Sequence, residues 1–338
     1  MLRLRLFIAV VATMLLVNAI AFVSCTRKSP TEPASGTERF IATIDTLPDR
    51  ESLGVAQEWY VQTSEQLDTL LDQSYGVDIM DGDTLRLKAD TLFNLGTKTY
   101  PTLQGMGLYI LGDSPRPTIK SSHNSGGTAV LTFQDASEER RMVFRNFAVN
   151  CSTISNDRAF IRTERHNAVE CEGISGYLRD AFFYFLADSV LVSDCNLTAT
   201  VICVAAFNRT NDDPVYVFDN VTMTTNSVST NNAIAAEFVN VSGSVTVKNS
   251  TFYSADADRK YYLRCLSSTS AGADSIDVVV HDNNMNDDVG AWLDGPPGGS
   301  AGIKYKVDFQ RNTLNTGDCP YFEDNGEMNC VSSSTMRL

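Results

Sequence analysis

Three charged residues in the second half of the chain are the strongest candidates for chemistry. Glu237, Arg264 and Asp294 fall in successive apolar segments of similar length. We therefore expect a repeating fold to bring the arginine between the two carboxylates, with Glu237 one repeat below and Asp294 one repeat above. Such an arginine is either half of a structural ion pair or a ligand contact. Paired carboxylates at a defined separation would also suit glycoside hydrolysis, so all three are candidate catalytic residues.

Aromatic residues occupy the same kind of segment. Aromatic rings stack on the C–H faces of sugars, and polar groups beside them bond the sugar hydroxyls. The sequence thus predicts a glycan-binding set, which comprises Arg162, Glu164, Tyr184, Tyr262, Arg264 and Trp292. A solvated surface of the same composition is the alternative interpretation.

A recurring phrase shows how these residues are positioned. It consists of two apolar residues five positions apart with a polar centre, and it occurs seven times, beginning at Phe144, Val169, Val192, Phe218, Val247, Val280 and Phe309. These first residues lie 25, 23, 26, 29, 33 and 29 positions apart. A constant phrase with variable insertions is typical of a stacked solenoid.

The third position of the phrase predicts a sharp bend. Its residues are Asn146, Cys171, Asp194, Asn220, Asn249, Asp282 and Arg311. Asn and Asp tolerate a left-handed backbone better than other residues that carry a side chain. Alternating, β-branched segments such as Val245-Thr-Val247 precede the bend, and one apolar residue follows it three positions later, so we expect strand, bend and strand.

A third apolar segment lies between successive phrases, as in Ala181 to Phe185. Three short strands per repeat, each beside its counterpart in the next repeat, would form parallel sheets. The sequence therefore predicts an all-β fold, a right-handed single-stranded parallel β-helix of about nine coils. The pattern resembles the pectate-lyase-like superfold over about residues 80 to 318. An immunoglobulin-like sandwich also has frequent turns, but it predicts no such period.

Alternation along the first strand of each coil sorts its side chains. We expect these to point inward: Leu131, Phe133, Ile161, Phe183, Phe185, Ala205, Phe207, Ala236, Phe238, Leu263, Cys265 and Leu293. We expect these to point outward: Thr132, Gln134, Arg162, Glu164, Tyr184, Asn208, Glu237, Tyr262, Arg264, Trp292 and Asp294. The resemblance implies that a ligand groove follows this outward face. In the similar lyases a basic residue abstracts a proton while acidic residues hold calcium, so calcium is expected only if the chain is a lyase.

The N-terminal segment predicts export and lipidation. Residues 1–24 contain two arginines, an apolar run and small residues before Cys25, and they resemble a bacterial lipoprotein signal whose cysteine receives the lipid. Residues 25–60 would form a tether and lead-in. Residues 61–338 would form the β-helix, covered at its N-terminal end by a helix at 63–73 and at its C-terminal end by a second cap. The chain is similar to Bacteroidetes surface lipoproteins, which implies an outer-membrane anchor facing the periplasm or the exterior.

Charge and cysteine content limit the kinds of molecule that the chain is expected to bind. The formal net charge of −14 disfavours nucleic acid, and we expect a monomer. Cys151, Cys171, Cys195, Cys203 and Cys265 fall where buried structural thiols are expected. Cys319 and Cys330 flank a short loop and are candidates for a disulfide. The scattered histidines and the lack of a C-x-x-C motif give no zinc-type spacing.

These features lead to one main hypothesis and two alternatives. The main hypothesis is a lipid-anchored envelope protein that binds a polysaccharide or cell-surface glycan along the first-strand face and needs no cofactor. The first alternative is a polysaccharide lyase or glycosidase that acts through Arg264, Glu237 and Asp294 on the same face. The second is a structural or adhesive surface protein without catalysis.

Overall fold

The computed structural model describes seventeen stretches of the chain, and all statements below concern them. They are residues 39–41, 56–73, 79–123, 129–135, 140–154, 158–200, 202–207, 215–226, 233–241, 243–254, 260–267, 275–285, 289–294, 304–314, 321–324, 327–330 and 336–337. The predicted signal segment, Cys25 and Cys319 lie outside them. No helix within these stretches is both long and apolar enough to cross a membrane.

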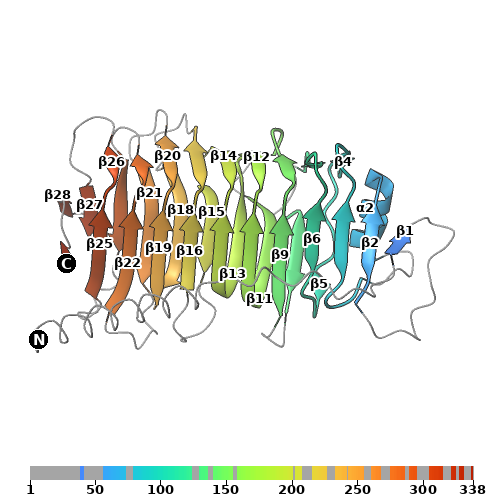
Figure 1. The fold of residues 1–338 in the computed structure, drawn as a ribbon, viewed down its shortest axis with the longest axis horizontal. Coiled ribbons are helices and arrows are strands. Elements are labelled where there is room, and N and C mark those ends of the chain that lie inside the picture. Colours follow the sequence, from blue (N-terminus) through green and yellow to red (C-terminus); the bar gives the residue numbers. More distant parts are fainter. Residues whose placement is uncertain are drawn as a thin grey trace, which may run out of the picture. The chain divides into compact units, whose positions relative to one another are not determined.

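The described strands are almost all parallel and are arranged as stacked coils (Figure 1). In each complete coil the chain passes through a first, a second and a third strand, which pair with their counterparts in neighbouring coils. The stacked strands form what we call the first, second and third sheets. This agrees with the predicted all-β, parallel β-helix-like architecture, and the long-range register excludes an antiparallel sandwich.

The first sheet carries the predicted ligand face. Its strands are β5 (Leu103–Gln104), β8 (Leu131–Gln134), the first parts of β11 (Arg158–Glu172) and β13 (Ala181–Ser193), β15 (Ile202–Phe207), β18 (Ala233–Val241), β21 (Lys260–Ser267), β24 (Val289–Asp294) and β27 (Tyr321–Asp324).

The second sheet continues from the first, because β11 and β13 run through both. Its other strands are β1 (Arg39–Ile41), β2 (Glu58–Val61), β3 (Thr84–Leu87), β6 (Tyr109–Gly112), β9 (Arg141–Arg145), β16 (Val215–Asp219), β19 (Ser244–Lys248), β22 (Ser275–His281) and β25 (Lys304–Gln310).

The third sheet has nine strands. They are β4 (Leu92–Asn94), β7 (Thr118–Lys120), β10 (Ala148–Asn150), β12 (Ser175–Arg179), β14 (Asn196–Ala199), β17 (Thr222–Thr225), β20 (Thr251–Ser254), β23 (Asn284–Met285) and β26 (Thr313–Leu314). Two short strands, β28 (Glu327–Cys330) and β29 (Met336–Arg337), pair antiparallel with β27 and β25.

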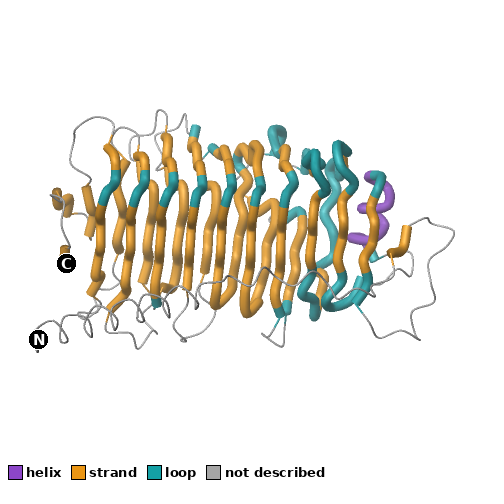
Figure 2. The backbone as a smooth tube through the Cα atoms, viewed as in Figure 1, coloured by secondary structure: helices purple, strands orange, loops and turns teal. Residues whose placement is uncertain are grey.

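Left-handed residues form the bend between the second and third sheets, where Figure 2 shows a short loop segment in coil after coil. Six predicted bend residues have φ between +52° and +58°, namely Asn146, Asp194, Asn220, Asn249, Asp282 and Arg311. The prediction at Cys171 is wrong. Cys171 pairs with Phe144 and Val192 within strands, and Gly173, at φ +64°, makes the bend. Glycine takes this conformation without a Cβ penalty.

Side-chain hydrogen bonds stack these bends on one another. The Asn220 amide donates to Asp194 (2.5 Å), and the Asn249 amide donates to Asp219 (2.9 Å). Arg311 donates to both carboxylate oxygens of Asp282 at 2.6 and 2.7 Å. The polar bend residues therefore serve two purposes, because they adopt the left-handed turn and also link neighbouring coils.

The interior is mostly apolar, and it includes a polar column near its C-terminal end. Alternating inward residues of the three sheets form a single core that includes Phe133, Phe183 and Phe238. The residue after the bend changes from Val221 to Ser250, Asn283 and Asn312 in successive coils. The Asn283 amide nitrogen donates to Val247 O (3.0 Å) and Asn312 Oδ1 (2.9 Å), while Asn283 Oδ1 accepts from the Ser250 backbone (2.9 Å). These bonds satisfy the polar groups of the buried Asn283 side chain.

One helix, α2 (Ser64–Asp72), lies at the N-terminal end of the described strands. Thr63 is its N-cap, and Thr63 and Gln66 form a capping box. Leu67, Leu70 and Leu71 are buried in the core. The helix therefore begins where the sequence predicts and packs through its leucine face.

Candidate functional site

The outward face of the first sheet brings most of the predicted ligand residues into one row. The strand register aligns, from coil to coil, Thr132, Arg162, Tyr184, Ala205, Glu237, Arg264 and Trp292. Neighbouring members lie about 4.8 Å apart along the stack. The expected alternation is confirmed for Leu131, Phe183 and Phe238, which are buried, and for Arg162 and Tyr184, which are half-buried on the other face.

Arg162, Glu164 and Tyr184 form a compact group on this row. The Arg162 guanidinium carbon lies 4.8 Å from the centre of the Tyr184 ring, and its Nε lies 2.6 Å from Glu164 Oε1. Burial raises the pKa of the Tyr184 hydroxyl; Arg162 lowers it and Glu164 raises it. The carboxylate therefore orients a cation that stacks on the ring.

Two further apolar residues extend this group. Phe182 and Leu186 precede and follow Tyr184 by two positions on β13, and both are half-buried on the outward face. The rings of Phe182 and Tyr184 lie 6.5 Å apart at 50°. We call Phe182, Tyr184 and Leu186 the apolar strip. Sequence reasoning missed its outer two members, although the same alternation that buries Phe183 and Phe185 would have placed them outward.

Glu237 and Arg264 form the second charged group of the row. Arg264 Nη1 lies 2.8 Å from Glu237 Oε1, and the two side chains are 24% and 11% exposed. Burial raises the pKa of Glu237, and Arg264 partly offsets this. A guanidinium that neutralises a desolvated carboxylate gives this end of the row little net charge.

Asp294 lies on β24, one coil above Arg264 as expected, but it is not in register with Arg264. In β24 it is Trp292 that pairs with Arg264, whereas Asp294 pairs with Leu266. The register shifts by one residue between Tyr261 and Leu263, which marks a bulge in β21. Arg264 thus has a carboxylate neighbour in the coil below and an aromatic residue in register in the coil above. The side chains of Tyr262, Trp292 and Asp294 lie outside the described residues.

The predicted phase of β15 is also wrong. Val204 and Ala206 pair with the inward Phe183 and Phe185, so Ala205 belongs to the outward row beside Tyr184. Ala205 is nevertheless only 1% exposed, because its short side chain lies between larger neighbours. The side chain of Phe207 and the whole of Asn208 lie outside the described residues.

The spacing of acidic residues on this face bears on hydrolysis. Glu164 and Glu237 stand on strands that are three positions apart in the sheet, so at least about 14 Å separates their backbones. Paired glycosidase carboxylates lie about 5 to 9.5 Å apart. These two glutamates therefore do not form such a pair. Within the stretches that the structure describes, no three His, Cys, Asp or Glu residues are grouped so as to hold a metal ion.

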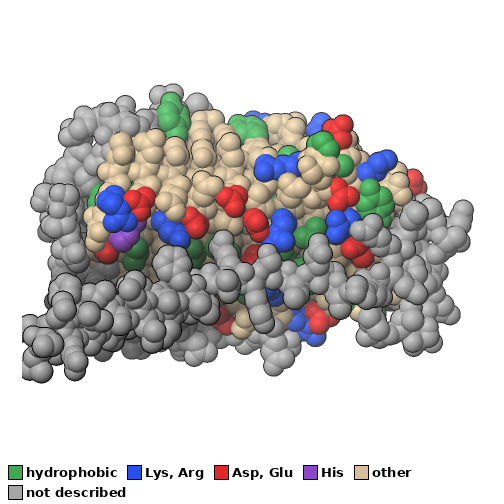
Figure 3. All heavy atoms as spheres, in the orientation of Figure 1, with side chains coloured by type: hydrophobic (Ala, Val, Ile, Leu, Met, Phe, Trp, Pro, Cys, Tyr) green, Lys and Arg blue, Asp and Glu red, His purple; other side chains and the backbone are tan. Residues whose placement is uncertain are grey.

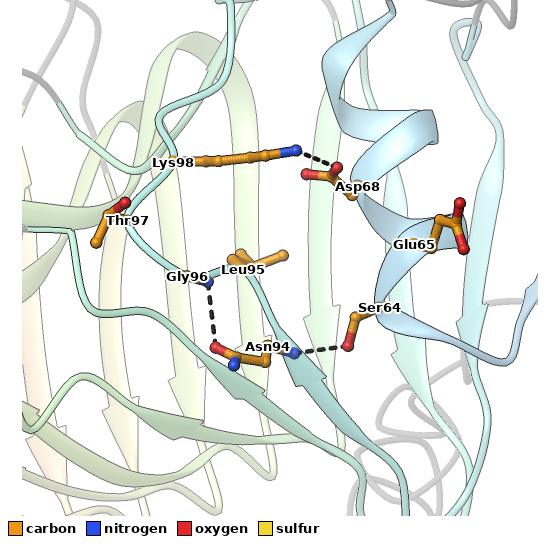
Figure 4. A pocket seen from close by; sticks show the side chains of 8 residues that line it. All are labelled: Ser64, Glu65, Asp68, Asn94, Leu95, Gly96, Thr97 and Lys98. Atoms are coloured by element: carbon orange, nitrogen blue, oxygen red, sulfur yellow. Dashed lines mark hydrogen bonds and ion pairs between the residues drawn. The ribbon is translucent and has the colours of Figure 1, made fainter.

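A pocket of about 410 Å³ lies beside α2, far along the chain from the apolar strip (Figure 4). Its polar groups bond mainly to one another: Lys98 pairs with Asp68, and Ser64 Oγ accepts from the Asn94 backbone at 2.8 Å. Tyr100 also donates to Asp68 (2.7 Å), and burial raises the pKa of its hydroxyl. These contacts attach the helix to the loop after β4, so we assign the pocket a structural role.

The second sheet carries ion pairs between coils. Acidic and basic side chains follow one another across its middle in Figure 3. They include Arg145 with Glu172 (2.9 Å) and Lys248 with Asp219 (3.2 Å), and His281 Nε2 lies 3.0 Å from Asp308 Oδ2. Because these charges have partners in the adjacent coil, the described pairs link coils electrostatically and offer little net charge to a ligand.

The cysteine predictions are confirmed in part. Cys151, Cys171, Cys195 and Cys203 are buried free thiols, and burial raises the pKa of Cys203 to about 12. Cys330 ends β28 opposite Tyr321, and its proposed partner Cys319 is outside the described residues. That disulfide stays a prediction.

Comparison with known proteins yields no relative. No protein family model, no curated protein and no solved structure matches this chain.

Proposed function

We propose that this chain is an envelope lipoprotein that binds a glycan on the outward face of its first sheet. The observation that carries the proposal is the group formed by Tyr184, Arg162 and Glu164. A half-buried ring with an oriented ion pair beside it offers a stacking surface together with hydrogen-bonding groups, which is the combination that sugars require.

The rest of the row supports a ligand longer than one sugar. The apolar strip is followed by the covered Ala205 and then by the Glu237–Arg264 pair, so apolar and polar groups alternate along several strands. Both charged groups are internally neutralised. This favours a neutral glycan over a polyanion, as does the net charge of −14.

Our proposal includes the finer features of the architecture. The nine strands of the third sheet support a right-handed, pectate-lyase-like β-helix of about nine coils. Helix α2, with its buried leucines, would cap the N-terminal end. A lipid on Cys25 would anchor the chain to the outer membrane, with residues 25–60 as the tether.

Binding to an array of soluble neutral oligosaccharides tests the function. Detergent-solubilised full-length protein is compared with Tyr184→Ala and Arg162→Met variants, and with Tyr60→Ala on the second sheet as the matched control. Loss of stacking at Tyr184 should weaken binding about tenfold, with the control unchanged. Equal binding by wild type and Tyr184→Ala would remove the basis for this site. A Tyr262→Ala plus Trp292→Ala variant tests whether the ligand extends to the last coils.

A further inference from the structure

From β12 onward, the third sheet presents two outward rows of uncharged residues; towards the N-terminus the second row continues through Asn150 to the charged Lys120. The register aligns Ser175, Asn196, Thr222, Thr251 and Asn284 in one row and Tyr177, Thr198, Thr224 and Tyr253 in the other. We call these nine residues the hydroxyl face. The chain as a whole is 20% charged, so four successive coils with only hydroxyl and amide groups differ clearly from the other two faces. In Figure 3 the upper surface over β14, β17 and β20 accordingly lacks the acidic and basic side chains seen below it.

The polar groups of the hydroxyl face are available to a ligand. All nine residues are exposed or half-exposed, and none of their side chains hydrogen-bonds within the described part of the chain. On the first and second sheets, by contrast, the outward charged groups pair with one another. Water or an external partner must therefore satisfy the hydroxyls of the third sheet.

Two tyrosines lie on this face, separated by a whole number of strand spacings. Tyr177 and Tyr253 belong to the same row and stand three strands apart, which separates them by about 14 Å. Tyr253 is 46% exposed although it is a large aromatic residue. Threonine side chains occupy the two positions between them, so the row reads as a ring, two hydroxyls and a ring.

We infer that the hydroxyl face is a second binding surface, and that its ligand is an extended, neutral, β-linked polysaccharide. The tyrosine rings would stack on sugar rings, while the threonine and asparagine rows would bond the hydroxyls between them. The strand spacing is similar to the length of one sugar unit in an extended chain, so successive units meet successive strands. A face without charge neither attracts nor repels charged polymers, and its rows of hydroxyl and amide groups lack the apolar centre of a protein interface. This inference does not depend on the first-sheet site.

Depletion of the protein by insoluble polymer particles tests the inference. Detergent-solubilised full-length protein is mixed with microcrystalline cellulose, with chitin or with granular starch, whose α-linked chains are not extended. At least one of the two β-linked polymers should deplete the protein more strongly than starch does. A Tyr177→Ala plus Tyr253→Ala variant should bind that polymer about tenfold more weakly.

A second variant tests the same surface with less risk of unfolding the protein. Thr222→Val plus Thr224→Val keeps the β-branched shape and removes two hydroxyls, so affinity should fall about threefold. Thr246→Val is the matched control, because Thr246 lies between Val217 and Val279 on the second sheet, and it should bind like wild type. Binding to neither β-linked polymer, or wild-type affinity in both hydroxyl-face variants, would overturn the inference. So would a change confined to self-association in sedimentation. Tyr184→Ala should lose soluble oligosaccharides and keep the polymer, so the two sites fail separately.

Discussion

Glu237 and Arg264 face each other across adjacent strands of the first sheet, with 2.8 Å between carboxylate and guanidinium. Even with this partner, burial raises the pKa of Glu237 above its ordinary value. For this carboxylate, desolvation therefore outweighs the attraction of its partner. Its nearest neighbours in register are Ala205 and Trp292.

Removal of Arg264 should destabilise the folded protein, because it leaves the buried Glu237 carboxylate without its cationic partner. Because both side chains are partly accessible, we expect Arg264→Met to lower the free energy of unfolding by about 1 to 2 kcal/mol near neutral pH. An acid with a raised pKa is protonated more readily in the folded state, so this loss should grow as pH rises above about 4.5. Urea unfolding of Arg264→Met, Glu237→Gln and the double variant measures it. If the three variants show no coupling, the ion pair contributes nothing to stability.

His166 should make the protein less stable in mild acid. Its ring is fully buried, Nε2 lies 2.8 Å from the Met106 carbonyl oxygen, and burial lowers its pKa. Nε2 must carry the proton in this contact, so further protonation would place a second N–H at the buried Nδ1. The unfolded chain binds that proton at about pH 6.5 and the folded chain only at lower pH, so stability is lost as pH falls below about 6.5.

Thermal unfolding at about pH 8 and about pH 5.5 checks the role of His166. The melting temperature of wild type should fall more between these conditions than that of His166→Gln, whose amide can still donate to Met106. An equal fall in both proteins would assign the acid sensitivity to groups other than His166.

Two variants at the left-handed Asn249 distinguish the contribution of backbone strain to stability from that of the side-chain hydrogen bond. Asn249→Gly keeps φ at +52° accessible but loses the bond to Asp219, whereas Asn249→Ala loses both. A left-handed alanine costs about 1 to 2 kcal/mol, which exceeds the entropic cost of glycine, about 0.5 to 1 kcal/mol. Asn249→Gly should therefore be the more stable variant in urea unfolding. The opposite order would show that the bend relaxes to another conformation.

Gly176 should tolerate no side chain. Its φ is +131°, and a Cβ there would overlap the backbone oxygen of Val149 in the neighbouring coil. We expect Gly176→Ala to cost more than about 3 kcal/mol or to prevent folding. Gly96→Ala is the control, because Gly96 also has a positive φ but has open space around it. Similar melting temperatures for the two variants would contradict the close approach of β12 to β10.

Much of the architecture could be predicted because every coil has the same two needs, a left-handed bend and an apolar interior. A left-handed bend favours Asn, Asp or Gly, and an interior needs alternating apolar residues. Coils such as those of Asn220 and Asn249 are therefore recognisable in the sequence. The prediction failed at Cys171 because Val169 and Ile174 lie five positions apart with polar residues between them. The segment therefore fits the recurring phrase although its bend lies elsewhere. Only the strand register shows that Gly173 replaces Asn at the bend.

The candidate site was less predictable for two physical reasons. The β15 strand is apolar on both faces, so alternation cannot fix its phase, and Ala205 was assigned to the wrong side. Near Tyr261 a bulge shifts the register, and no local sequence signal reports the neighbour that Arg264 then acquires. The pairing of Glu237 with Arg264 was predictable, since no such shift lies between those residues.

The polar column of Ser250, Asn283 and Asn312 fixes the register between the last coils. If one strand slipped by a single residue, its inward and outward side chains would exchange places, and the amides of this column would lose their partners inside an apolar interior. An all-aliphatic column would be far more tolerant of such an offset. The asparagines thus fix where each late coil begins relative to the one before it, and so keep the outward rows on every face continuous.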